Sequence, residues 1–506
     1  MAHISFRSLM LAGAVAGALA PIGFSTAASA QVLEVAVDAS PVGLDPHRAT
    51  AFSTFQMING TIYEGLTAID KDLRVQPGLA QSWTISPDGK TYTFKLRPGM
   101  VFHDGAKVEA ADVVATINRV LSKEIASPLA SRLAALDRAE AVDSVTVVLT
   151  LKEPSAPLLV SIASIAIVPR SMEAEKEALQ RTPIGTGPFK FKEWQANGFV
   201  ALEKHAGYWR QGAPKLDGIK FNIVPESATR QVGIGSGQYA MLPNIDAATA
   251  MQLKGRPGVK LAETLELAYT FVGVNTSRPP FDDARVRQAV NFALNRSEII
   301  AAALFGAGVP GGPLSPALKD WAMPASEFAC YKHDPAKAQA LLKEAGHAGP
   351  VAITINVLPR QDIRDIAQVV QAQLNKAGFK VELKNQEMGQ FIQDWRNSNF
   401  DMFASTNAGS ADPDDYFFRT FRTGGSTNVF KYTNSELDGL LDSARTMQDA
   451  GARKTAYAKV QGILACDGPI MHIAYGQLFT ALRNNVQGFE IIANRSLATL
   501  ADATAR

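Results

Sequence analysis

Two clusters of polar residues have types and spacings that could bind a cation. Asp412, Asp414 and Asp415 lie close enough in sequence to suggest calcium, whose ligands are carboxylate and carbonyl oxygens. They lack the spacing, the glycine and the closing glutamate of an EF-hand loop. The segment Asp45-Pro46-His47 also offers two metal ligands, but Asp-Pro is foremost a turn-forming pair. We therefore predict no metal site and no cofactor.

Two glycine-rich segments resemble catalytic or phosphate-binding loops only superficially. Residues 183–190, PIGTGPFK, lack the third glycine and the Gly-Lys-Ser/Thr ending of a phosphate loop. In residues 233–237, GIGSG, the serine comes one place too late for a nucleophile elbow, and no strand is expected before it. The seven histidines are scattered and form no His-Glu-x-x-His pattern. A secreted hydrolase is disfavoured, and we expect the protein not to be an enzyme.

The elements that would position a site are most distinct between residues 82 and 121. Residues 82–85 and 91–96 alternate with period two around Pro87-Asp88-Gly89, which predicts a half-buried hairpin. After a second turn, His103-Asp104-Gly105, apolar residues follow helical spacing. The predicted helical stripe consists of Val113, Val114, Ile117, Val120 and Leu121.

The second half of the chain alternates between strand and helix patterns. Residues 351–357 and 379–383 predict strands, and the amphipathic segment 362–376 between them predicts a helix. A further strand is expected at 400–404. Strand, helix, strand is the unit of a parallel sheet with crossover helices, which predicts an α/β fold class.

Length and composition restrict the classes of partner. A chain of 506 residues exceeds one hydrophobic core, so two or more domains are expected. Lys and Arg number 50 against 48 Asp and Glu, which leaves no basic surface excess for a nucleic acid. We expect no nucleic-acid partner.

The N-terminus has the pattern of a secretory signal peptide over residues 1–30. Arg7 precedes a short apolar stretch from Leu9 to Phe24, and Ala28-Ser29-Ala30 supplies a small-residue cleavage site. There is no cysteine at the cleavage point, so no lipid anchor is expected. A protein that diffuses freely after secretion needs an outer membrane to retain it, which favours the periplasm.

The only two cysteines, Cys330 and Cys466, leave two interpretations open. In an oxidising compartment they could form a disulfide. Alternatively they are separate buried thiols that pack as small apolar groups.

Several segments together resemble the family 5 bacterial extracellular solute-binding proteins, the receptors of ATP-driven importers for dipeptides, oligopeptides and nickel. The resemblance rests on a hairpin that ends in LRPGMVFHDG and is followed by the helix AADVVATINRVL. It continues through IGTGPF and through AYTFVGVN, PPFDD and ARVRQAVNFALNR. It covers essentially the whole chain after the signal peptide.

The resemblance implies a two-lobed periplasmic-binding-protein fold of class II type, with an extra domain on the first lobe and the ligand between the lobes. The expected lobe 1 is 31–75, 190–273 and 484–506; the accessory domain is 76–189; lobe 2 is 274–483. Hinges are expected near Asn275 and at 480–486. The implied partners of this monomer are a small solute and the membrane permease subunits of an importer.

The resemblance also implies a set of ligand-binding residues, in which this chain departs from the dipeptide receptors. Those receptors carry an acid, just before an Asp-Pro-Asp segment, that holds the amino group of the peptide; the aligned residue here is Gly409. Arg360 is the nearest match to their carboxylate-binding base, with Arg364 as competitor. We expect a peptide-like or other carboxylate-bearing solute whose free amino group is not required; a metal chelate or an opine-type ligand is the alternative. The implied contacts are Phe52, Ser53, Tyr269, Arg360, Asn407, Gly409, Ser410 and Asp412.

Overall fold

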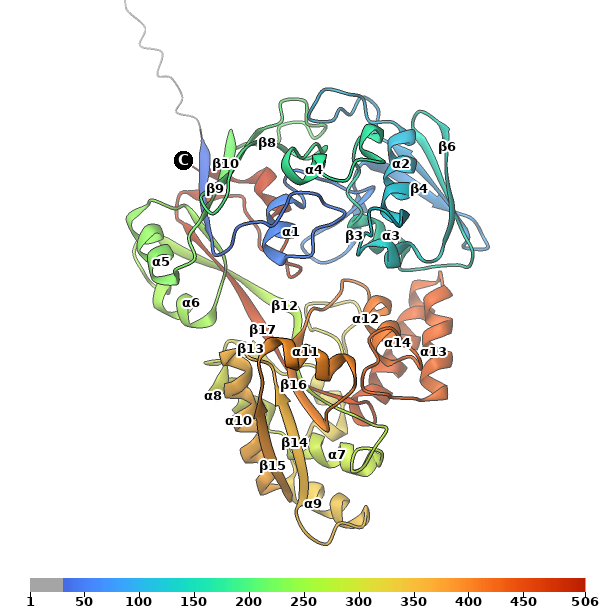
Figure 1. Cartoon of the computed structure of the whole chain (residues 1–506), viewed down its shortest axis with the longest axis vertical. Coiled ribbons are helices and arrows are strands. Elements are labelled where there is room, and N and C mark those ends of the chain that lie inside the picture. The colour runs from blue at the N-terminus through green and yellow to red at the C-terminus, as the bar shows by residue number, and fades with distance from the viewer. Residues whose placement is uncertain (1–30, 506) are drawn as a thin grey trace, which may run out of the picture. The chain divides into compact units, whose positions relative to one another are not determined.

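The computed structural model describes residues 31–505, so the predicted signal peptide over 1–30 lies outside the described residues. Within them, no helix combines the length and the apolar character needed to cross a bilayer. Two halves of one mixed sheet run through the two lobes, and a separate sheet forms the accessory part, drawn in blue and cyan in Figure 1.

An eleven-stranded sheet is the backbone of both lobes. Lobe 1 is built on β1 (Val32–Val37), β8 (Phe189–Gln195), β9 (Phe199–Lys204), β10 (Gly218–Ile223) and β11 (Met241–Ile245). Lobe 2 is built on β13 (Gly308–Val309), β14 (Val351–Val357), β15 (Phe379–Asn385) and β16 (Met402–Asn407). The long strands β12 (Val259–Val274) and β17 (Ile470–Arg483) belong to both lobes. The strand order is β15-β14-β16-β12-β17-β11-β1-β10-β9-β8. The short strand β13 lies off this path and pairs with β17 at Tyr475 and Gly476, on the edge opposite β12.

The connection between the lobes lies inside β12 and β17, which pair with each other in both lobes (Figure 1). On β17, Phe479 and Leu482 pair with β11 of lobe 1, whereas on β12 the pairing with β16 of lobe 2 begins at Tyr269. The β12–β17 register is irregular between Leu265 and Tyr269. Strand pairing therefore involves lobe 2 from Tyr269 onward on β12, and lobe 1 from Phe479 onward on β17. No turn or loop marks this change of lobe in the sequence, because each strand continues across it.

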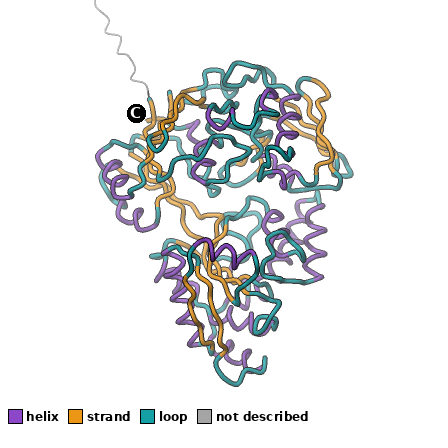
Figure 2. The backbone as a smooth tube through the Cα atoms, viewed as in Figure 1, coloured by secondary structure: helices purple, strands orange, loops and turns teal. Residues whose placement is uncertain are grey.

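The accessory part is a four-stranded antiparallel sheet of order β4-β5-β7-β6, seen as a separate group of strands in Figure 2. Its strands are β4 (Ala80–Ile85), β5 (Thr91–Leu96), β6 (Leu136–Asp143) and β7 (Thr146–Leu151), and its helices are α2 (Ala110–Leu121) and α3 (Leu158–Ala163). The predicted hairpin is confirmed: Tyr92 and Phe94 are fully buried on one face. The predicted helix is confirmed too, except that Leu121 at its end is exposed.

Lobe 2 has the predicted parallel unit, because β14 pairs in parallel with both β15 and β16. Asp334 caps α9 by accepting from the backbone N–H of Lys337. The helices of lobe 2 are α7 (Ala284–Ala293), α8 (Arg296–Ala303), α9 (Pro335–Glu344), α10 (Gln361–Lys376), α11 (Met388–Arg396), α12 (Pro413–Phe421), α13 (Ser435–Thr446) and α14 (Ala450–Cys466). Lobe 1 carries α1 (Phe52–Ile58), α4 (Ala178–Arg181), α5 (Ser227–Ser236) and α6 (Ala247–Leu253). Two short strand pairs also occur in the described residues, β2 (Thr67–Ile69) with β3 (Val75–Pro77) and β18 (Val486–Gln487) with β19 (Thr504–Ala505). Isolated bridges join Asn59 with Tyr63 and Val101 with Lys107.

Cys330 and Cys466 form a disulfide between the segment before α9 and the end of α14. Of the two interpretations left open by the sequence, the structure has the bridge, which closes a loop over 136 residues of chain. It lies within lobe 2, next to the buried side chains of Phe328 and Tyr331.

The Asp45-His47 turn is a buried structural element. The Asp45 carboxylate and the Arg119 guanidinium form an ion pair of 2.6 Å with neither side chain exposed. His47 accepts from Arg119 at Nδ1 and donates from Nε2 to the carbonyl of Ala166. Burial lowers the pKa of His47 to about 4, so the ring is neutral at neutral pH. Both ring nitrogens already have hydrogen-bond partners, which leaves neither of them for a cation.

Candidate functional site

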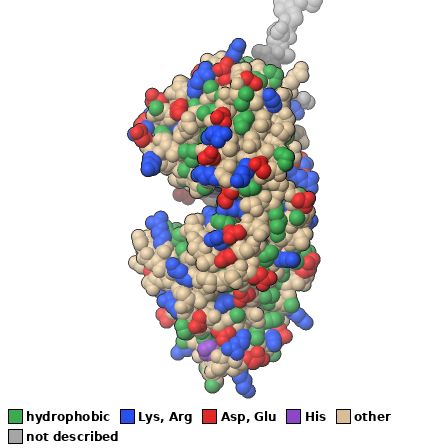
Figure 3. Space-filling view, turned by 90° about the vertical axis from the view of Figure 1, so that its right-hand side faces the viewer, with side chains coloured by type: hydrophobic (Ala, Val, Ile, Leu, Met, Phe, Trp, Pro, Cys, Tyr) green, Lys and Arg blue, Asp and Glu red, His purple; other side chains and the backbone are tan. Residues whose placement is uncertain are grey.

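A cavity of about 950 Å³ lies between the lobes, a volume typical of small-molecule sites. Figure 3 shows the notch that opens between the two lobes on one side of the molecule. Residues from seven segments line it: 244–248, 266–268 with 270, 303–305 with 307, 360–362 with 365, 406–409, 476–478 and 493–495. The site is therefore assembled from segments far apart in the sequence.

The fold places the carboxyl ends of two parallel strands at this cavity. β14 and β16 run in the same direction, and the segments that follow them supply Arg360 and residues 407–409. In open α/β sheets, ligands bind at the carboxyl ends of the strands, where loops rather than ladder partners follow. The same geometry directs the N-terminal end of α10 toward the cavity.

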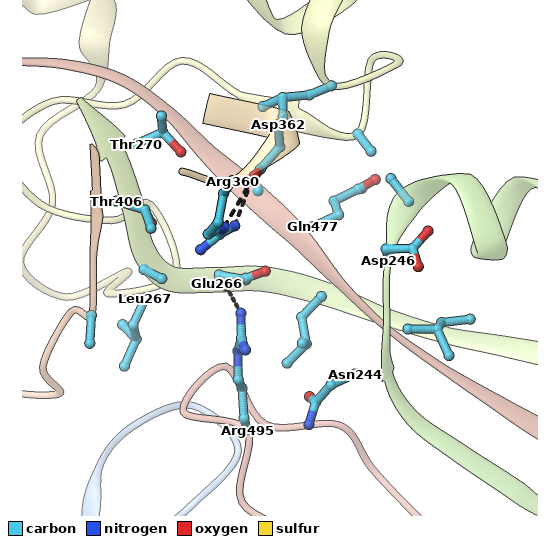
Figure 4. A pocket seen from close by; sticks show the side chains of 18 of the residues that line it. Asn244, Asp246, Glu266, Leu267, Thr270, Arg360, Asp362, Thr406, Gln477 and Arg495 are labelled. Carbon is cyan, nitrogen blue, oxygen red and sulfur yellow. Dashed lines mark hydrogen bonds and ion pairs between the residues drawn. The ribbon is translucent and has the colours of Figure 1, made fainter. Parts of the chain in front are cut away.

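Arg360 is the N-cap residue of α10 and lines the cavity. Its guanidinium binds the carboxylate of Asp362 at 2.5 Å, and the two side chains are 52% and 37% exposed. Figure 4 shows Arg360 in the cavity with dashed contacts to Asp362. An exposed pair of this kind contributes little to folding, so the guanidinium remains able to exchange its partner.

Glu266 is a pocket carboxylate that sequence reasoning missed. It lies on β12 within the irregular stretch between Leu265 and Tyr269, and its side chain is 16% exposed. It forms an ion pair with Arg495 from the C-terminal segment of lobe 1 (Figure 4). The sequence signal was a glutamate inside an otherwise apolar segment, LELAYTFVGV, just before the family motif.

The predicted contact residues divide into two groups. Arg360, Asn407 and Gly409 line the cavity, whereas Tyr269, Ser410, Asp412 and Ser53 are not among its described lining residues. Phe52 begins α1 in lobe 1.

Tyr269 contacts a residue that lines the cavity. It is buried and accepts a hydrogen bond of 3.2 Å from Asn407 Nδ2, so it orients a lining residue without reaching the cavity. Desolvation by burial raises the pKa of Tyr269 far above its usual value.

Asp412 has a structural role in lobe 2. Its carboxylate receives two hydrogen bonds, of 2.6 and 2.8 Å, from Arg453, and both side chains are 6% exposed. It also caps α12 by accepting from the backbone N–H of Asp414. Asp414 is buried beside it, and desolvation raises the pKa of Asp414 to about 6. Within the described residues, no group of three or more His, Cys, Asp or Glu side chains could hold a metal ion.

Gly409 is required by close backbone packing. A Cβ atom at this position would lie 2.1 Å from the carbonyl oxygen of Leu267 on the neighbouring strand. A carboxylate therefore cannot be introduced here without displacing β12, and the acidic group that dipeptide receptors carry at the aligned position is sterically excluded.

The remaining glycine-rich segments are structural as well. Residues 233–236 lie inside α5, and Gly237 ends that helix with a φ of 88°. The backbone of Gly187 donates to the carbonyl of Ile62, which packs the PIGTGPFK segment against lobe 1.

Comparison with known proteins agrees with this architecture. The model for "Bacterial extracellular solute-binding proteins, family 5 Middle" matches residues 74–428. The glutathione-binding protein GsiB of Pectobacterium atrosepticum is 29% identical over 504 residues, which cover 97% of this chain and 96% of the relative. The structure of HbpA2 from Haemophilus parasuis superposes with a TM-score of 0.85 at 26% identity, covering 94% of this chain and all (100%) of that chain.

A further similar structure was solved with a bound ligand. AgaA of A. tumefaciens R10, in complex with agropinic acid, superposes with a TM-score of 0.76 at 25% identity, covering 94% of this chain and 99% of that chain. Relatives of this kind are substrate-binding proteins rather than enzymes. Since the family model covers well over half of the sequence, the chain belongs to family 5 of the bacterial extracellular solute-binding proteins, the solute receptors of ATP-driven importers.

Proposed function

We propose that this receptor binds a peptide-like solute through a carboxylate held by Arg360 in the cavity between the lobes. The observation that carries the proposal is an exposed guanidinium on the cavity wall, at the N-terminal end of a sixteen-residue helix. A planar guanidinium binds a carboxylate with two parallel hydrogen bonds, and the helix dipole adds a favourable positive potential. The Asp362 carboxylate already accepts two hydrogen bonds from the Arg360 guanidinium, which is the arrangement proposed for the ligand carboxylate.

Glu266 and Arg495 supply the second polar contact of the proposed site. The pair joins the central strand β12 to the C-terminal segment of lobe 1, so a solute that touches it bridges the two lobes. The prediction that a free amino group is not required rested on the missing acid at Gly409. Glu266 is a cavity carboxylate that can bind an ammonium group in place of that acid.

Glutathione is the first solute to test, because the similar GsiB of P. atrosepticum is named for binding it. An opine-type ligand is the second, because AgaA was solved with agropinic acid. Both compounds carry carboxylates, which is the group that Arg360 is placed to bind. We propose that binding is not followed by turnover.

Delivery to the permease completes the proposal. The protein would act as a monomer in the periplasm, without a lipid anchor, and would present the closed form to the membrane subunits. N-terminal sequencing of the secreted protein should begin at Gln31.

Mass spectrometry of small molecules released from natively purified protein tests the proposed ligand class directly. Calorimetric titration with glutathione, an N-acetylated dipeptide, agropinic acid and a nickel–histidine chelate then ranks the alternatives. We expect a carboxylate-bearing, peptide-like compound in the released fraction, and a recovered compound unchanged after prolonged incubation. A released compound without any carboxylate, or hydrolysis of the recovered compound, would contradict the proposal.

A further inference from the structure

Phe305 is a large aromatic side chain that the fold leaves in solvent. It is 69% exposed and lines the cavity between the lobes. Among the residues whose exposure the structure describes, no other Phe, Tyr or Trp side chain is exposed. An aromatic ring kept out of the core at a binding cavity contributes apolar contact area to a ligand rather than to folding.

The backbone at Phe305 favours a different residue. Phe305 and Gly306 both have positive φ, of 54° and 75°, and Ala307 donates its N–H to the carbonyl of Leu304 at 2.8 Å. Two central residues with positive φ are characteristic of a type I′ turn, in which Asn-Gly is the preferred pair. A bulky residue at the first position is strained and gains no burial in return. Stability of the isolated fold therefore does not explain this phenylalanine.

The cavity wall on the side of Phe305 is mainly apolar, with Asn244 and Asp246 as its polar residues. Ala303 ends α8 in lobe 2 and is followed by Leu304 and Ala307, whereas Ala247 and Ala248 begin α6 in lobe 1. The one acidic residue on this side, Asp246, is engaged as the N-cap of α6 through the N–H of Thr249 at 2.7 Å. This end of the cavity thus differs from the end that holds Arg360.

The sheet separates the two ends of the cavity. β16, which ends at Asn407 and is followed by Gly409, lies on one side of β12, and β13, which follows Phe305, lies on the far side of β17. Three inter-strand steps of about 4.8 Å therefore separate β16 from β13, or roughly 14 Å. In Figure 4, Arg360 and Thr406 lie on one side, Asn244 and Asp246 on the other, and Glu266 and Gln477 between them.

We propose that the cavity contains an apolar subsite walled by Phe305, at the end opposite Arg360. The preferred solute is then elongated: a carboxylate binds at Arg360, polar groups cross the strands near Glu266, and an apolar substituent packs on the Phe305 ring. The proposal rests on the proposed function, since Arg360 defines the carboxylate end.

Calorimetry with glutathione and S-hexylglutathione tests the subsite, because the two probes share their carboxylates and differ by one alkyl chain. The unmodified protein should bind S-hexylglutathione at least about tenfold more tightly, since burial of two methylene groups already exceeds that factor. Phe305→Asn should reduce the preference to below about threefold and raise the melting temperature, because Asn suits the turn. Phe305→Leu should keep most of the preference. Val232→Asn, at another exposed apolar residue that lies on α5 outside the cavity lining, is the control and should keep all of it.

The outcomes distinguish this inference from the proposed function. Binding of glutathione without any gain from the hexyl group, or a preference that survives in Phe305→Asn, overturns the apolar subsite and leaves the carboxylate site intact. Failure of both probes to bind the unmodified protein overturns the proposed peptide-like ligand and the subsite together.

Discussion

Two arginine–aspartate pairs in lobe 2 have the same chemistry and opposite surroundings. Arg453 and Asp412 are each 6% exposed and form two hydrogen bonds in the interior. Arg360 and Asp362 are 52% and 37% exposed at the edge of the cavity. Both regions were candidates for ligand contact from sequence, yet only one of them faces the cavity.

The comparison shows that burial decides whether a charged pair serves folding or binding. A buried carboxylate that loses its cation is left unpaired in a medium of low dielectric constant, so the pair is bound to its structural role. An exposed pair loses little when it opens, and either partner can accept a ligand group instead. The Arg119–Asp45 pair, which joins α2 of the accessory part to lobe 1 and has no exposed surface, belongs to the first kind.

Breaking the buried pair should have the largest effect. Asp412→Asn leaves the Arg453 guanidinium unpaired in the interior and should lower the free energy of unfolding by about 3–5 kcal/mol. Urea denaturation followed by circular dichroism measures it, with Asp362→Asn as the matched control at less than about 1 kcal/mol. Equal losses in the two variants would contradict the distinction.

Lowering the pH should reduce the free energy of unfolding through His47, which is buried beside Asp45 and Arg119. Its pKa is lowered from 6.5 to about 4 by burial, so the unfolded chain takes up a proton at a higher pH than the folded protein does. The contribution of His47 to the free energy of unfolding is therefore fully present above pH 6.5. It is lost as the pH falls toward 4, by about 3 kcal/mol in total. Unfolding free energies measured from pH 7 to 4 should fall less steeply in His47→Gln than in the unmodified protein. Parallel curves would show that the ring does not contribute.

Removing the exposed arginine should affect binding and not folding. Arg360→Ala should weaken the binding of glutathione by about 2 kcal/mol or more, because the ligand carboxylate loses its partner. The free energy of unfolding should change by less than about 0.5 kcal/mol. Arg285→Ala is the control, because Arg285 forms a similar exposed pair with Asp283 outside the lining of the cavity. Unchanged calorimetric affinity in Arg360→Ala would remove Arg360 from the site.

The smallest effect is expected from the partner of that arginine. Asp362 competes with a ligand carboxylate for the guanidinium fork, so Asp362→Asn should tighten glutathione binding by about 0.5 kcal/mol, or roughly twofold. The same titration measures it. Weaker binding would show that Asp362 orients Arg360 instead of competing for it.

Local sequence patterns were sufficient for most of the elements. The alternation of Tyr92 and Phe94 placed the hairpin, and the apolar spacing from Val113 to Val120 placed α2, because a strand face or a helix face depends on residues within a few positions of one another. The family resemblance extended this to the two-lobed fold. The strand β6 was missed, since most of its residues are polar and exposed.

The cavity was decided by the tertiary structure. Sequence alone ranked Asp412 with Arg360 as a ligand contact, and only packing against Arg453 made Asp412 structural. Phe305 carried no local signal of function, and the glutamate in LELAYTFVGV did not show that Glu266 lines a cavity, because both roles follow from which distant segments the two long strands bring beside them. A repeating pattern of neighbours can be read along a chain, whereas the exposure of one side chain depends on contacts whose partners lie hundreds of residues away.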